Sequence, residues 1–127
     1  MQRNQSDGRI RYLLVLYEIS QQKERVRSID VANALHVSRS SVHHMMQMLA
    51  DEGLITKDHY SDIVLTEAGW EEAGRRYEQY RCVREMFSGW LALPPEQAQS
   101  EAMTFLATQA EDTAQRLVQA FAAAETN

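Results

Sequence analysis

VSRSSVHHMMQMLADEGLI (residues 37–55) has the pattern of a short turn followed by an amphipathic helix. Apolar side chains recur at i, i+3, i+4 and i+7, the spacing of a buried helical stripe: Val42, Met45, Met46 and Leu49. Polar side chains recur at the same spacing on the opposite side: Ser40, His43, His44 and Gln47. This polar face has hydrogen-bonding groups and no acid. It suits the reading of base edges in a DNA major groove, although a solvated helix face has the same pattern.

The residues before this stretch predict a shorter helix. Ser28 is expected to cap it, and Asp30 falls in its first turn, where a carboxylate meets the positive end of the helix. Its inner face is expected to consist of Ile29, Ala32 and Leu35. His36, Val37 and Ser38 would then form a short turn, with Ser38 capping the next helix. Two helices joined by such a turn indicate a helix-turn-helix.

The residues after the stretch predict a β-hairpin. Gly53 is expected to end the helix in a left-handed conformation. Leu54 and Ile55 follow, then a polar turn over residues 56–62 and a strand over residues 63–66. Thr66 begins a long helix, LTEAGWEEAGRRYEQYRCVREMF. This order of elements is typical of a winged helix-turn-helix module.

The second half of the chain is expected to be entirely helical. An apolar stripe runs along the long helix, and Pro94 and Pro95 end it. Residues 96–124 contain neither Gly nor Pro; they predict one long helix, or two with a bend near residues 109–113. We therefore predict a mainly α chain with a DNA-binding domain over residues 1–66 and a helical dimerisation domain over residues 67–127. A homodimer would cover the apolar helix faces and match two-fold DNA sites.

Charge is unevenly distributed along the chain. The net charge is −5, but residues 1–60 carry eight Lys or Arg against seven acids, and residues 61–127 carry five against eleven. The acids thus lie mainly outside the proposed reading head. No apolar run is long enough for a membrane span, and no secretory signal precedes the first helix. A cytoplasmic protein is expected. No paired catalytic carboxylates or phosphate loop indicate an enzyme.

The order and spacing of these segments resemble the diphtheria-toxin-repressor and manganese-transport-regulator family of bacterial metal-dependent repressors. The resemblance rests on RYLLVLYEI (residues 11–19), residues 26–55, VLTEAG (residues 64–69) and the Leu91-Ala92-Leu93 … Ala98 … Ala102 pattern. It implies a homodimer of the short subclass, without an SH3-like domain, that binds operator DNA through Ser38, Arg39, Ser40, Ser41 and His44. His43, Gln47 and the wing residues Lys57 and Tyr60 complete the candidate DNA-contacting set. Ser61 and Asp62 stand where the family's wing often has arginine or glycine, which puts strong wing–phosphate contact in doubt.

The resemblance also implies a divalent-metal site, and here the sequence departs from the family. The family's ligand positions fall on Arg11, Leu14, Arg81, Met103, Leu106 and Ala107. Only Met103, a soft ligand, could bind a metal in its usual ionisation state. We therefore expect no manganese or iron at this site, although the family leaves such a metal possible. Glu85 is the expected partner of Arg81, and a shifted register would instead offer Glu111 and Asp112.

Two other interpretations stay open at this stage. Cys82, beside Arg81 and Arg84, could be a reactive thiolate in a thiol- or ligand-responsive regulator, or simply a small buried hydrophobe. A different class is an interaction protein that forms heterodimers with a related repressor and binds no DNA itself.

Overall fold

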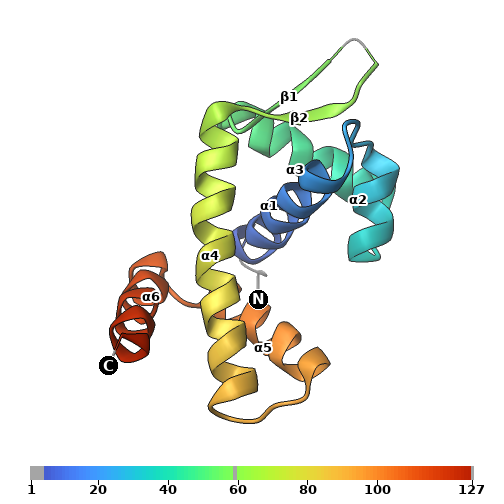
Figure 1. Ribbon diagram of the computed structural model, residues 1–127. Coiled ribbons are helices and arrows are strands. Elements are labelled where there is room, and N and C mark those ends of the chain that lie inside the picture. The colour runs from blue at the N-terminus through green and yellow to red at the C-terminus, as the bar shows by residue number, and fades with distance from the viewer. Residues whose placement is uncertain (1–4, 59, 127) are drawn as a thin grey trace. The chain divides into compact units, whose positions relative to one another are not determined.

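The computed structural model describes residues 5–58 and 60–126, with side chains from residue 8 onward. These residues form a mainly α chain with one two-stranded antiparallel sheet (Figure 1). In chain order the elements are α1 (Gln5–Gln22), α2 (Ser28–Leu35), α3 (Arg39–Asp51), β1 (Ile55–Lys57), β2 (Ile63–Leu65), α4 (Glu67–Gly89), α5 (Pro95–Thr108) and α6 (Glu111–Glu125). None of the described helices has the length and hydrophobicity that crossing a membrane requires.

The chain divides into two compact units. One spans Arg11–Gly74 and holds most of α1, then α2, α3, the hairpin and the first turns of α4. The other joins the residues up to Ile10 with Arg75–Asn127. We refer to them as the winged unit and the helical unit.

The helix-turn-helix of the winged unit is the predicted one, with two corrections at α2. Ser28 is the first residue of α2 and not its cap; the cap is Arg27, whose backbone N–H donates to Oδ2 of Asp30 over 2.9 Å. Ile29 was expected on the inner face but is 37% exposed, whereas Val31 is fully buried. The prediction of the inner face failed because it assumed Ser28 to be the cap, whereas Ser28 is the first helical residue. Val31 and Ala32 are the residues of α2 that face the core.

The turn between α2 and α3 uses a histidine where glycine is common. His36 has φ of 57°, and the N–H of Val37 donates to the carbonyl of Ala32 over 3.1 Å. Ser38 caps α3 as predicted, since its Oγ accepts from the N–H of Ser41 over 3.1 Å. Gly53, at φ of 80°, follows the end of α3 in the predicted left-handed conformation.

The hairpin pairs Ile55 with Leu65, Thr56 with Val64 and Lys57 with Ile63. The predicted turn over residues 56–62 was too long, because Thr56 and Lys57 belong to β1. A further backbone bridge joins Val26, before α2, to Ile63. Through this bridge the segment between α1 and α2 is tied to the wing.

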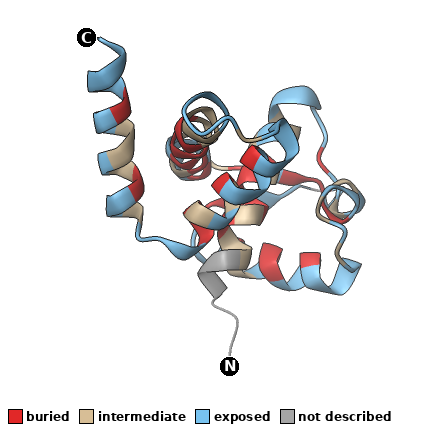
Figure 2. Ribbon diagram, turned by 90° about the horizontal axis from the view of Figure 1, so that it is seen from below, coloured by how far each residue is buried: buried red, intermediate tan, exposed pale blue. Residues whose placement is uncertain are grey.

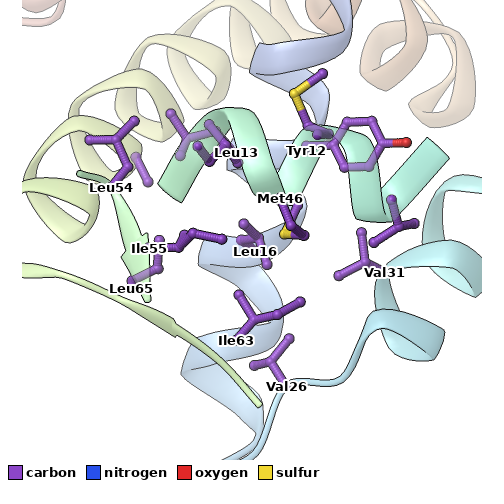
Figure 3. Close-up of a cluster of buried hydrophobic side chains, with 14 of the residues drawn as sticks. Tyr12, Leu13, Leu16, Val26, Val31, Met46, Leu54, Ile55, Ile63 and Leu65 are labelled. Atoms are coloured by element: carbon purple, nitrogen blue, oxygen red, sulfur yellow. The ribbon is translucent and has the colours of Figure 1, made fainter. Parts of the chain in front are cut away.

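Side chains from all these elements form one core (Figure 3). Leu13 and Leu16 of α1, Met46 and Leu49 of α3, and Ile55 of β1 are at most 1% exposed. Burying a side chain of this size stabilises the fold by about 1.5–3 kcal/mol. The core holds α3 in place by its apolar stripe, so that the opposite stripe faces solvent.

The start of α4 approaches the hairpin closely at Gly69. A Cβ built there would lie 2.0 Å from the carbonyl oxygen of Leu54. Thr66 caps this end, because its Oγ1 accepts from the N–H of Gly69 over 3.0 Å and donates to the carbonyl of Gly53 over 2.7 Å.

In the helical unit, residues 96–124 form two helices and not one, with the break at Gln109 and Ala110. Pro95 begins α5, as predicted. The helices bury small side chains, including Ala98, Ala102 and Ala114, and alternate between buried and exposed positions (Figure 2). Trp90 packs on Phe121 with ring centroids 5.6 Å apart.

A buried polar network crosses the helical unit. Gln79, which is fully buried, donates to Oε2 of Glu111 over 3.1 Å and to Oε1 of Gln115 over 2.9 Å. Arg76 donates to the side chain of Gln79 over 2.5 Å and to the carbonyl of Leu106 over 3.2 Å. Hydrogen bonds thus link α4 to the last turns of α5 and the first turns of α6.

Candidate nucleic-acid interface

The outer face of α3 presents polar side chains without bulky apolar groups. Ser40, His43, His44 and Gln47 are all exposed, while Val42, Met45, Met46 and Leu49 are buried. The division of α3 into two faces is therefore the predicted one. Gln47 donates to Oδ1 of Asp51 over 3.3 Å, so its amide is held at the far end of the helix from the turn.

Three hydroxyl groups gather at the turn end of α3. The Oγ of Ser38 lies 3.1 Å from Oγ of Ser40 and 3.0 Å from Oγ of Ser41. All three residues are exposed, and so is Arg39 beside them. Hydroxyls and backbone N–H groups at a helix N-terminus suit an anionic phosphate, and Arg39 adds the cation. Ser38 is first of all a helix cap, which the fold needs whether or not DNA is bound.

The wing adds a second set of exposed groups. Lys57 and Tyr60 are exposed, with Tyr60 at 76%. Asp58 is part of the turn itself, since its Oδ1 accepts from the N–H groups of Tyr60 and Asp62, both over 2.9 Å. Ser61, at φ of 61°, completes the turn.

Asp62 is a buried acid of the wing. It is 4% exposed, and its Oδ2 accepts from Nε of Arg25 over 2.6 Å. Local sequence pattern gives no signal for this pair, because Arg25 and Asp62 lie 37 positions apart. The wing carries one acid fewer at its surface than its sequence indicates.

The residues at the family's metal positions do not carry hard-metal ligands. Leu14, Leu106 and Ala107 are buried apolar side chains, and Met103 is partly buried. Arg81 donates to Oε1 of Glu78 and Oε1 of Glu85, both over 2.6 Å. These bonds raise the pKa of Arg81 and keep it cationic, and the bond to Glu78 has the larger effect on the pKa. The chemistry of these side chains does not fit a divalent cation.

The carboxylates considered as substitutes have protein partners. Glu111 accepts from Nε of Arg75 over 2.7 Å and from Gln79, and the bond to Arg75 is the main reason that its pKa is lowered. Asp112 pairs with Arg116 over 2.9 Å, and Glu85 with Arg81. Across residues 8–58 and 60–126, no three His, Cys, Asp or Glu side chains come together as a metal site would need.

Cys82 lies on the buried side of α4. Its side chain is 2% exposed, and burial raises the pKa of the thiol, with Glu78 adding to the effect. A raised pKa disfavours the thiolate, which is the reactive form. Cys82 therefore has the surroundings of a small core residue.

The sequence of the winged unit matches a known family. Residues 10–63 fit the family described as the N-terminal DNA-binding domain of iron dependent repressors. The match covers less than half of the chain and shows that this segment is similar to that DNA-binding domain. The resemblance and the winged helix-turn-helix fold that the sequence predicted are thereby confirmed.

Solved structures extend the likeness beyond this domain. IdeR of T. acidophilum is 24% identical with a TM-score of 0.75, and the match covers 96% of this chain and 55% of that one. The manganese regulator SloR is 26% identical with a TM-score of 0.75, covering 94% and 54%. ScaR with bound Zn²⁺ is 26% identical with a TM-score of 0.69, covering 87% and 52%. This chain thus spans about half the length of these regulators. The comparison with curated proteins gives no match.

Proposed function

We propose that this chain is a sequence-specific DNA-binding transcriptional repressor. The observation that carries the proposal is the exposed polar face of α3, in a domain of the iron-dependent-repressor family. His44, Ser41, Ser40, His43 and Gln47 read base edges in the major groove. Ser38, Arg39, Lys57 and Tyr60 contact the phosphate backbone. Residues 1–66 are the DNA-binding part, and the protein acts in the bacterial cytoplasm.

The repressor acts as a homodimer through residues 67–127. Trp90 and Leu91 support this proposal, because they are 59% and 62% exposed in the single chain. Large exposed apolar side chains favour an interface, and paired reading heads fit two-fold DNA sites. With a net charge of −5, the protein depends on two heads binding together for its affinity.

The repressor does not depend on a divalent metal at the family's site. Support comes from Arg81, which two carboxylates hold at a position where the family has a ligand, and from the apolar Leu14, Leu106 and Ala107. The protein is either constitutively competent for DNA binding or controlled by another signal.

Selection of bound sequences from a random pool of duplex DNA tests this function. We expect enrichment of a two-fold symmetric site, equally with chelator, with manganese and with iron. Sedimentation in chelator at micromolar concentration should give a dimer, and a monomer there would contradict paired heads. No duplex binding at low salt, together with stable capture of a purified related repressor, would identify the chain as an interaction protein instead.

A further inference from the structure

Arg25 contacts the wing although it lies outside it in the sequence. Its Nε donates to Oδ2 of Asp62 over 2.6 Å, and its guanidinium carbon lies 5.2 Å from the ring centroid of Tyr60. The next residue, Val26, accepts a hydrogen bond from the N–H of Ile63 over 2.8 Å. The guanidinium is therefore held against the wing by an ion pair, a ring and the backbone bridge beside it.

The two partners of the ion pair differ in exposure. The Asp62 side chain is 5% exposed and that of Arg25 is 53% exposed. The bond to Asp62 uses Nε, and among the described residues the terminal nitrogens of Arg25 have no hydrogen-bond partner. A guanidinium whose outer N–H groups face solvent can bind a phosphate with two parallel hydrogen bonds. Asp62 thus positions the guanidinium through Nε, while the terminal nitrogens of Arg25 stay available to a ligand.

The wing has little positive charge of its own. Residues 55–65 contain one lysine, no arginine and two aspartates. Tyr60, at 76% exposure, presents an aromatic ring beside the guanidinium. A ring and a guanidinium side by side form a surface suited to a nucleotide backbone, where the cation meets the phosphate and the ring packs on the sugar.

We propose that Arg25 is a DNA-binding residue that adds a phosphate contact at the wing from the segment between α1 and α2, with Asp62 and Tyr60 holding it in position. This inference rests on the proposed function, since the phosphate belongs to duplex DNA. It assigns a contact to a residue outside the helix-turn-helix and the hairpin. The contact is to the backbone and is therefore independent of base sequence.

The test measures dissociation constants from 50 to 200 mM salt, on the selected site and on random duplex. Arg25→Gln keeps a donor for Asp62 but removes the charge. It should lower the slope of log affinity against log salt by about 0.9 per protomer, on both duplexes alike. That slope change corresponds to about a 3.5-fold smaller loss of affinity across this salt range. Arg116→Gln is the matched control: Arg116 also pairs with an aspartate, but on α6, and its side chain is 77% exposed. It should leave the slope unchanged.

Asp62→Asn makes the test specific to a direct contact. Asparagine can still accept from Nε, but it no longer compensates the guanidinium charge. DNA binding should therefore tighten, opposite to the effect of Arg25→Gln. A purely structural ion pair would instead weaken binding in both variants, and that result would overturn the proposal. Arg25→Lys is the second variant to measure if Arg25→Gln fails to fold. Because it retains the charge, it should keep the wild-type slope.

The two proposals fail in different ways. An unchanged slope in Arg25→Gln, with wild-type protein still binding its selected site, would overturn the role of Arg25 alone. Absence of duplex binding by the wild-type protein at 50 mM salt would overturn the proposed function and this inference together.

Discussion

At the scale of single residues, His44 is the side chain whose replacement best tests base reading. It is exposed on the polar face of α3, and its removal takes away a hydrogen-bonding group without touching the buried stripe. His44→Ala should weaken specific binding by about 1–3 kcal/mol and relax the preference at one base pair per half-site. Competition binding with single-base variants of the selected site measures this.

Arg39→Ala serves as the comparison for His44→Ala. Arg39 is exposed at the turn end of α3, where a phosphate contact is expected. Its loss should weaken all sequences to the same extent and flatten the salt dependence. If His44→Ala instead keeps the full base preference of the wild type, the polar face is placed in the wrong register.

At the scale of elements, Gly69 decides how closely α4 approaches the hairpin. Alanine ordinarily stabilises a helix interior by about 1 kcal/mol relative to glycine. At position 69, however, the new Cβ would lie 2.0 Å from the backbone oxygen of Leu54, so the helix must shift. Gly69→Ala should therefore lower the free energy of unfolding in urea by more than about 1 kcal/mol.

Gly74 in the same helix is the matched control for Gly69. A Cβ there would meet the ring of Tyr17 at 3.5 Å, which is ordinary contact. Gly74→Ala should raise stability by about 0.5–1 kcal/mol. Equal effects of the two substitutions would show that α4 does not lie against Leu54 as described.

Glu111 joins the start of α6 to α4 and should make stability depend on pH. Its pKa is lowered, chiefly by the hydrogen bond from Arg75. The charged form is thus favoured by folding: its contribution is present above the unfolded pKa, near 4.5, and is lost as pH falls through the lower folded value. Glu111→Gln should cost about 0.5–1 kcal/mol at pH 7, discounted for partial exposure, and progressively less as the pH falls below the unfolded pKa.

Thermal melts from pH 3 to pH 7 measure that difference, with Asp112→Asn as the control. Asp112 is the neighbouring acid, forms an ion pair with Arg116 of the same helix, and is 76% exposed. Its replacement should change the melting temperature by less than half as much. A Glu111→Gln difference that persists unchanged at low pH would show that charge is not its cause.

Periodicity predicted α3 well because its pattern is local. The apolar stripe of α3 repeats within two helical turns: Val42, Met45, Met46 and Leu49. The Ser38 cap accepts from Ser41, three residues further on. The pair of Arg25 and Asp62 could not be predicted, because it joins residues 37 positions apart. The burial of Gln79 was missed for the same reason: a polar residue is expected at the surface unless its partners are known. The break at Gln109 and Ala110 was predicted only as an alternative, since neither residue is a strong helix breaker.

At the scale of the whole molecule, the altered metal positions lead us to expect that divalent cations do not change the stability of the proposed repressor. Manganese, iron, cobalt or zinc at low micromolar concentration should change neither the melting temperature nor the operator affinity. A ligand of the folded state at 100 times its dissociation constant would add about 2.7 kcal/mol, an easily measured shift. A rise of several degrees with manganese that EDTA abolishes would contradict this prediction. Its loss in Glu111→Ala or Asp112→Ala would then place the metal at α6.

The buried amide of Gln79 has a consequence for how this chain can diverge. Its donors and acceptor serve Arg76, Glu111 and Gln115, so an apolar substitution at any one of these four positions removes a hydrogen-bond partner from another. A buried donor without a partner costs about 1–3 kcal/mol, whereas exchanging the whole set for apolar side chains can be nearly neutral. The four positions should therefore change together among descendants of this sequence, and intermediates that carry one change alone should be the rare ones.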